Sequence, residues 1–382
     1  MKSTIPIIAL LISALALPAF SQTPPRKSWP HSCFVYKDMN FSGVFDMGDK
    51  PYSGLRIEVT RPDGSKIKRK SNIDGFANFN ASLGDKEADI FEPGKHNIRA
   101  VYPDGWQSLS SYDRQEMHFE INLDVGGSMI PKATCRPIGV APILTVEGFL
   151  QPEKGKTVDG HVVTAVSRDG MPDISLSIAR DGTFTGIGTR GKWRLEIHDA
   201  LGDLVYSRDF EIEYGAIIFS DIDLSRDIVP ELEQVYETVD FDDLLIANPL
   251  FELPSGYGGL NWLNWIAVHN RYYEGSGYVN STVSSEFAAY ISSGVPGPVW
   301  SDGPFDFKGT YIGVAWSRGE EGEVLVRAWR GEDLVHFDRL KLTNNGSVFF
   351  DANYEDITKL EFSHENYERI VFDNFQYKLQ TR

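Results

Sequence analysis

The sequence predicts an all-β protein in which two small sandwiches precede a larger jelly-roll sandwich. Three observations predict this class. Short runs alternate apolar with polar residues, clusters of Asp, Gly and Pro separate those runs, and helical periodicity is hard to find anywhere in the 382 residues. Alternation of this kind indicates antiparallel strands with one solvated face.

The composition is that of an ordinary globular protein. Hydrophobic residues make up 41% of the chain and charged residues 24%, which argues against a disordered or fibrous protein. The formal net charge is −17. Because a nucleic-acid binder needs basic surface to release counterions from the phosphates, we expect no nucleic-acid partner.

Residues 1–21 have the pattern of a secretory signal peptide. Lys2 supplies the positive start, residues 5–17 form an apolar run, and Ala19-Phe20-Ser21 is a small-x-small cleavage site. The run is too short to span ~30 Å of hydrocarbon comfortably. We therefore expect no integral membrane anchor, a short tether over 22–31, and a secreted, periplasmic or cell-surface location.

The two cysteines, Cys33 and Cys135, bracket the first globular segment. An exported chain folds in an oxidising compartment, where a pair of cysteines is more often a disulfide than a metal or catalytic site. We expect a disulfide; the alternative is two buried thiols.

Three modules follow from the strand pattern, with boundaries at residues 32–137, 138–229 and 236–379. The first contains the run Leu55–Val59, which is apolar at every second position and is followed by the turn Arg61-Pro62-Asp63-Gly64. The second repeats this style, and an acidic linker around Pro230–Glu233 leads into the third. The third module is the longest and the richest in aromatic residues.

The segment 38–49 has the spacing of an EF-hand calcium loop. Oxygen ligands fall at positions one, three, five, nine and twelve, and Gly43 stands at position six, where the loop must turn sharply. Asp49 replaces the usual Glu at position twelve. The shorter Asp side chain is less suited to binding calcium through both of its carboxylate oxygens. The alternative is an ordinary acidic turn. The predicted calcium ligands are Asp38, Asn40, Ser42, Val44, Asp46 and Asp49.

The residues around this loop resemble the B-type repeats of bacterial surface adhesins. In that family an acidic loop precedes a Gly-(Leu or Val)-x-Val strand, here Gly54–Val59, and an Asp-Gly-x-Phe-x-Phe type strand follows, here Asp74–Phe79. The resemblance covers about residues 33–125. It implies a calcium-stiffened, prealbumin-like (immunoglobulin-like) sandwich used as a stalk or adhesive module. The middle segment is similar to carboxypeptidase regulatory-like domains of the same sandwich type.

The third module carries its own motifs, namely Phe241-Asp242-Asp243, Tyr257–Trp265, Phe305-Asp306-Phe307 and Asp373-Asn374. They resemble those of a secreted all-β module found at the ends of bacterial and fungal extracellular proteins. The general shape of that module is similar to galactose-binding-like carbohydrate modules, and the resemblance implies a jelly roll.

The first and last strands of such a jelly roll commonly lie side by side. This arrangement would bring Asp240, Asp242 or Asp243 close to Asp373. Clustered carboxylates repel one another unless a cation neutralises them. One hypothesis is therefore a second calcium site at Asp240, Asp242 and Asp373. The other hypothesis is that these acids cap turns and bond backbone amides.

Aromatic side chains offer platforms on which sugar rings stack. A single strand over Trp262–Val268 would place Leu260, Trp262, Ile266 and Val268 on one face, so Trp262 is expected in the core. For each of the remaining aromatic candidates, burial in the core is the alternative to sugar binding. The candidate ligand-binding residues are Trp265, Tyr273, Tyr278 and Trp300.

Catalysis finds little support in the sequence. There is no Gly-x-Ser-x-Gly elbow, no His-Glu-x-x-His and no P-loop, so no residue is assigned a catalytic role. The sequence favours an exported, non-catalytic binding or adhesion protein, stiffened by calcium, whose last module binds a glycan or an extracellular surface partner. The alternatives are a polysaccharide-active hydrolase and a structural spacer in a surface layer.

Overall fold

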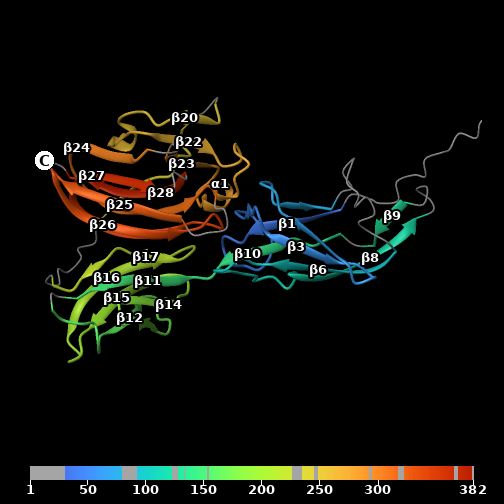
Figure 1. Cartoon of the computed structure of the whole chain (residues 1–382), viewed down its shortest axis with the longest axis horizontal. Coiled ribbons are helices and arrows are strands. Elements are labelled where there is room, and N and C mark those ends of the chain that lie inside the picture. Colours follow the sequence, from blue (N-terminus) through green and yellow to red (C-terminus); the bar gives the residue numbers. More distant parts are fainter. Residues whose placement is uncertain are drawn as a thin grey trace, which may run out of the picture.

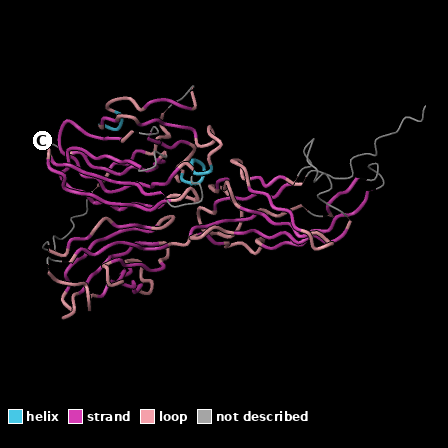
Figure 2. Tube along the Cα trace, in the orientation of Figure 1, coloured by secondary structure: helices cyan, strands magenta, loops and turns pink. Residues whose placement is uncertain are grey.

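The computed structural model describes residues 31–79, 93–122, 128–132, 134–152, 155–225, 235–244, 248–291, 295–316, 322–364 and 369–380. The predicted signal peptide, most of the tether and the linker around Pro230–Glu233 lie outside these ranges. Strands dominate the described chain (Figure 2), which confirms the all-β class. None of the helices in these ranges is long and apolar enough to cross a membrane.

The first module is a two-sheet sandwich. One sheet has the order β2-β1-β10-β7, with β5 also paired to β1, and the other has the order β4-β3-β6-β8-β9. The apolar faces of the two sheets meet in a core that includes Val35, Ile57 and Val140. The strands are β1 (Ser32–Lys37), β2 (Lys50–Pro51), β3 (Arg56–Thr60), β4 (Lys66–Lys70), β5 (Phe76–Asn78), β6 (Gly94–Val101), β7 (Trp106–Gln107), β8 (Arg114–Asn122), β9 (Ser128–Pro131) and β10 (Ile138–Pro142).

Strand β10 lies beyond the predicted boundary at residue 137 but belongs to the first module. It pairs in parallel with β1 (Val35 opposite Ile138), and both Ile138 and Val140 are fully buried in the first core. The core of the middle module begins at Leu144. The boundary therefore lies near residue 143 rather than 137, because the last strand of the first sandwich inserts beside its first strand.

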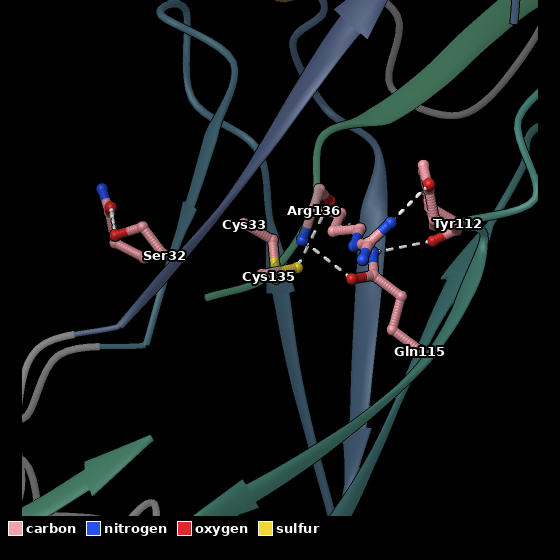
Figure 3. The surroundings of a disulfide bond; sticks show 7 residues. Ser32, Cys33, Tyr112, Gln115, Cys135 and Arg136 are labelled. Atoms are coloured by element: carbon pink, nitrogen blue, oxygen red, sulfur yellow. Dashed lines mark hydrogen bonds between the residues drawn. A yellow bond between two sulfur atoms is a disulfide. The ribbon is translucent and has the colours of Figure 1, made fainter. Parts of the chain in front are cut away.

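The predicted disulfide joins Cys33 on β1 to Cys135, with the two Cα atoms 5.2 Å apart (Figure 3). Beside it, Gln115 accepts the Arg136 amide at 2.8 Å and donates to the Arg136 carbonyl at 3.0 Å. His31 also lies against the two sulfurs. Because these sulfurs are bonded to each other, the group offers no thiolate ligands for a metal.

The middle module is a second sandwich, with sheets β13-β12-β15-β16 and β14-β11-β17. Trp193, Leu195 and Phe184 lie in its core. Its strands are β11 (Thr145–Gln151), β12 (Val162–Ser167), β13 (Ile174–Ile178), β14 (Thr183–Ile187), β15 (Gly191–His198), β16 (Leu204–Ile212), β17 (Ile217–Phe219) and β18 (Ile222–Asp223).

The C-terminal module is the larger jelly-roll sandwich. Its long strand β24 pairs with both β27 and β28, and the main core contains Trp262, Trp265 and Phe375. Its elements are β19 (Glu237–Val239), β20 (Leu250–Glu252), the 3-10 turn η2 (Tyr257–Gly259), β21 (Asn261–Trp262), β22 (Trp265–His269), α1 (Ser276–Ser281), β23 (Phe287–Ile291), β24 (Gly297–Val314), β25 (Gly322–Arg330), β26 (Asp333–Leu342), β27 (Val348–His364) and β28 (Ile370–Leu379).

The middle and C-terminal modules share a continuous network of strands. Strand β17 pairs in parallel with β27, with Ile218 opposite Phe350, and the buried Arg208 forms an ion pair with Asp351 at this joint. In Figure 1 these two modules lie beside one another, and the first module extends to one side.

Candidate functional site

The predicted calcium loop connects β1 to β2 and contains no helix. It begins at Asp38, which is 1% exposed and whose amide donates to the Val140 carbonyl at 2.9 Å. Strand pairing therefore fixes the position of the first predicted ligand, because Asp38 directly continues β1.

The two oxygens of Asp38 accept backbone amides from within the loop. Oδ1 accepts the Ser42 amide at 2.9 Å and Oδ2 accepts the Gly43 amide at 2.7 Å. Gly43 has a φ of +76°, a conformation that costs glycine little. The sharp turn at the sixth position is thus present, as the spacing predicts.

Four of the predicted ligands contact one another on the exposed side of the loop. The Asn40 amide nitrogen lies 3.0 and 3.1 Å from the two carboxylate oxygens of Asp46. The Ser42 hydroxyl lies 2.9 Å from both the Val44 carbonyl and Asp46 Oδ2. The oxygens of positions five, seven and nine are therefore already gathered in one place.

Asp49 closes the loop from its other end. Its carboxylate accepts the Met39 amide and the Asp46 amide, both at 3.0 Å. Burial raises the pKa of Asp49 above its ordinary value, the two amides lower it, and the nearby carboxylates of Asp38 and Asp46 raise it further. A cation beside these carboxylates would oppose that repulsion.

The donors of this set are of the chemical kinds that a hard divalent cation takes, although the carboxylate oxygens of Asp38, Asp46 and Asp49 do not all lie within 4.8 Å of one another. Carboxylate, amide, hydroxyl and carbonyl oxygens are the ligands that calcium takes. Within the described ranges, no Lys or Arg nitrogen lies within ion-pair distance of Asp38, Asp46 or Asp49. Backbone amides, the Asn40 amide and the Ser42 hydroxyl are the hydrogen-bond donors that engage these carboxylates.

Two lysines flank the loop and hold the C-terminal module. The Lys37 ammonium contacts the carbonyls of Val279, Asn280 and Thr282 at 2.9, 3.3 and 2.5 Å. Three acceptors match the three donors of an ammonium group. Lys37 is completely buried, and burial lowers its pKa well below the ordinary value.

Lys50 repeats this contact at the other end of the loop. Its ammonium bonds the carbonyls of Val283 and Ser285 at 3.0 and 3.1 Å. Nearby, Asn280 exchanges hydrogen bonds with the backbone of Ser53, at 2.9 and 3.0 Å. The loop therefore lies between two attachment points to one segment of the C-terminal module.

The loop also contacts the middle module. Arg190 donates to the Asn40 carbonyl at 3.4 Å, and the rings of Phe41 and Tyr214 lie 5.9 Å apart. Phe41 packs against the middle core. All three modules therefore meet at the predicted calcium loop.

The acids of the second predicted calcium site lie close to one segment of the chain. Strands β19 and β28 are neighbours, as expected for the first and last strands of the jelly roll, with Val239 opposite Phe375. Asp242 accepts the amides of residues 285–287 at 2.8–2.9 Å. Asp373 accepts the amides of Val283 and Ser284 at 2.6 and 2.7 Å.

These amide contacts are those expected if the three acids cap turns and bond backbone amides rather than bind a metal ion. Burial raises the pKa of Asp242, but the backbone amides more than offset this, so its pKa is lowered. Burial raises the pKa of Asp373 to about 6, although its amide partners lower it. The remaining member, Asp240, accepts the Asp242 amide at 3.1 Å. Hydrogen-bond donors therefore already engage each of the three carboxylates.

Two of the predicted sugar-binding aromatics are wrong, because both are buried. Trp265 is 1% exposed, and its ring lies 4.4 Å from that of Phe372. The predicted single strand is broken at Asn264, whose φ is +67°, so Trp262 and Trp265 both point into the main core. Tyr278, on α1, is completely buried in a smaller cluster with Tyr290.

The other two predicted aromatics are partly exposed. Tyr273 packs among Tyr278, Tyr290 and Trp316, with the Arg369 guanidinium 4.7 Å from its ring centroid. Trp300 lies on β24, directly across from Lys359 of β27.

Trp300 belongs to a row of side chains that crosses the sheet. Lys359 lies opposite Trp329 of β25 as well as opposite Trp300, and its ammonium is 3.8 Å from the Trp329 ring centroid. Two residue pairs further along, and so on the same face, Arg327 and Glu361 form an ion pair at 3.5 Å. Aromatic rings and charged hydrogen-bonding groups thus share this partly exposed face.

Sequence reasoning missed Lys37 and Lys50. Both stand at strand ends beside an acidic loop, where a lysine is ordinarily solvated. Their partners lie more than 200 positions away, at separations of 242 and 233 residues for Val279 and Val283. No pattern of neighbouring residues indicates that Lys37 and Lys50 bond such distant carbonyls.

No family model matches the chain, and no curated protein matches it in sequence. Among solved structures, the minor pilin GBS52 of Streptococcus agalactiae is 12% identical, covers 54% of this chain and 98% of its own, and has a TM-score of 0.19. The major pilin subunit BcpA of Bacillus cereus is 9% identical, covers 86% of this chain and 100% of its own, and has a TM-score of 0.19.

A third similar structure holds the CBM22-1 and GH10 modules of xylanase 10B from Clostridium thermocellum. It is 14% identical, covers 32% of this chain and 26% of its own, and has a TM-score of 0.21. At these TM-scores the likenesses carry no functional conclusion for this chain.

Proposed function

We propose that this chain is an exported, non-catalytic binding or adhesion protein in which calcium stiffens the joint between the modules. The observation that carries the proposal is the position of loop 38–49. It starts directly after Lys37 and ends directly before Lys50, and both lysines bond carbonyls of residues 279–285.

The physical argument rests on charge. Three carboxylates within twelve residues repel one another when no cation is present. Calcium would hold them together and thereby stiffen the loop that connects Lys37 to Lys50, two residues that already lie opposite each other as a strand pair. Asp38, Asn40, Ser42, Asp46 and Asp49 would supply side-chain oxygens and Val44 its carbonyl. A rigid joint suits a protein that must hold its first and last modules in one fixed relative orientation.

Calorimetric titration of the mature chain with CaCl2 tests the metal. We expect one site with a Kd of about 10⁻⁴ to 10⁻³ M, the range of extracellular calcium modules. Asp46→Asn should weaken binding at least about tenfold, because it removes a charge from the ligand set.

The matched control is Asp63→Asn. Asp63 sits in an exposed turn and accepts the Ser65 amide at 2.8 Å, so its substitution should leave calcium affinity unchanged. Absence of heat in the wild-type titration, or equal weakening by both substitutions, would refute a calcium site in loop 38–49.

We assign the glycan contact to the C-terminal module at the Trp300 face, defined by Trp300, Trp329, Lys359, Arg327 and Glu361. Sugar rings stack on aromatic faces while charged and polar neighbours bond their hydroxyls. The partial exposure of Trp300 and its cross-strand position beside Lys359 support this choice. Export through the segment 1–21 would place this face outside the cytoplasm.

A further inference from the structure

The outward face of one sheet in the first module is rich in cations. Strand alternation puts Ile57, Val59, Ile98 and Met117 into the core, so the residues between them point away from it. This face, the basic face, spans β4, β3, β6 and β8. Its cationic residues, all exposed, are Arg56, Lys66, Lys68, Lys70, Lys95, Arg99 and Arg114.

The register places these cations beside one another. Lys70 lies opposite Arg56, and Arg99 lies opposite Arg114. Between Lys68 and Arg99 stands Glu58, which pairs with both in the strand register. Because neighbouring strands are about 4.8 Å apart, the cations form rows that cross the sheet.

The acidic residues on this face do not cancel its charge. Glu58 is 13% exposed at its side chain and is 3.5 Å from Lys68, whose side chain is 57% exposed. Lys95 pairs with Glu116, and Lys132 pairs with Glu120 at 2.7 Å. The face therefore remains net positive, although the whole chain carries −17.

We propose that the basic face binds an anionic polysaccharide, a polymer with regularly spaced carboxylate or sulfate groups. Rows of exposed cations on a flat sheet match the repeating charge of an extended polyanion. The acidic surface of the other modules acts weakly on it, because charges beyond about 8 Å are screened at physiological ionic strength.

The same face fits other macromolecules less well. Apart from Val101, its described outward residues are polar or charged, and none is Phe, Tyr or Trp; His118 supplies the one imidazole among them. Single-stranded nucleic acid is gripped by stacking on aromatic rings, and a stable protein interface has an apolar centre. Neither a row of such rings nor an apolar centre occurs among these described side chains.

Binding of fluorescent sodium polygalacturonate to the full mature chain tests the proposal. The buffer contains EGTA, so that calcium cannot bridge protein and polymer. We expect binding that weakens steeply as NaCl rises, and no binding of neutral dextran. The variant Lys68→Gln, Arg99→Gln, Arg114→Gln should bind at least about tenfold more weakly, because each substitution removes an exposed ion pair with the polymer.

The matched control removes three exposed cations elsewhere, through Lys156→Gln, Arg180→Gln and Lys341→Gln. It should keep wild-type affinity, and unchanged thermal unfolding of both variants shows that the fold is retained. Equal weakening by both variants, or no binding by the wild type, overturns the proposal. So does tighter binding of an oligonucleotide, or salt-sensitive self-association without polymer binding. Because EGTA is present, this result is independent of the calcium site in loop 38–49.

Discussion

The ammonium nitrogen of Lys37 lies 2.9 Å from the carbonyl oxygen of Val279, 242 positions further along the chain. Val279 belongs to α1, whose last carbonyls lack intrahelical partners. The contact therefore satisfies backbone acceptors of the last module with a side chain of the first. It makes the junction part of the folded structure rather than a hinge between separate modules.

Replacing Lys37 by Met should destabilise this junction. The carbonyls of Val279, Asn280 and Thr282 would lose their donor in a buried place, which costs about 2–4 kcal/mol of unfolding free energy. Chemical denaturation measures the loss. Lys66→Met is the control, since Lys66 is exposed, and it should change stability by less than about 0.5 kcal/mol. Equal losses of unfolding free energy for the two substitutions would show that the buried hydrogen bonds of Lys37 do not stabilise the junction.

Removal of the disulfide should destabilise the first module strongly. Cys33 and Cys135 close a loop with a sequence separation of 102, and the chain-entropy model gives roughly 4.7 kcal/mol for such a loop. The double variant Cys33→Ala, Cys135→Ala should melt at the temperature of the reduced wild type. A variant as stable as the oxidised protein would show that the crosslink constrains little.

Stability should fall on acidification because of His31. Burial lowers the pKa of His31 to about 4, whereas the unfolded residue titrates near 6.5. Between these values the unfolded state holds more protons, so lower pH favours unfolding, here by roughly 2 kcal/mol from pH 6.5 to pH 4. His31→Leu should lack this component. The difference between wild type and variant across pH isolates it, and a difference independent of pH would contradict the assignment.

Glycan binding should depend on Trp300. Trp300→Ala should weaken binding of the chain to a glycan found by array screening by at least about fivefold, because stacking contributes about 1 kcal/mol or more per ring. Trp316→Ala is the comparison, since Trp316 is 39% exposed in the same module but packs near Tyr273. Loss with Trp316→Ala alone would place the sugar at the Tyr273 cluster instead.

The local sequence pattern predicted those structural features that depend on residues close together in the chain, namely strand faces and turns. Leu55, Ile57 and Val59 are buried as their alternation requires, and Gly64 bonds back to Arg61 in the predicted turn. In loop 38–49, Gly43 adopts the positive φ expected at the sixth position and the oxygens of Ser42, Val44 and Asp46 lie together, whereas the carboxylates of Asp38, Asp46 and Asp49 do not all lie within 4.8 Å of one another.

The failures have equally specific causes. Asn264 adopts a left-handed conformation, which shifts the side-chain phase between Trp262 and Trp265, and no period-two pattern reveals such a shift. The boundary at 137 failed because β10 pairs with the distant β1. Lys37 bonds carbonyls at the end of α1, more than 200 positions away, and the basic face and the Trp300 row arise from pairing between separate strands. Periodicity encodes neither.

We propose that an ion in loop 38–49 stiffens the joint between the first and last modules. Amide hydrogen exchange, followed by mass spectrometry in CaCl2 and in EGTA, tests it most directly. We predict that calcium slows exchange both in residues 38–49 and in residues 279–287, and that Asp46→Asn removes both effects. Protection confined to the loop, with residues 279–287 unchanged, would contradict the account.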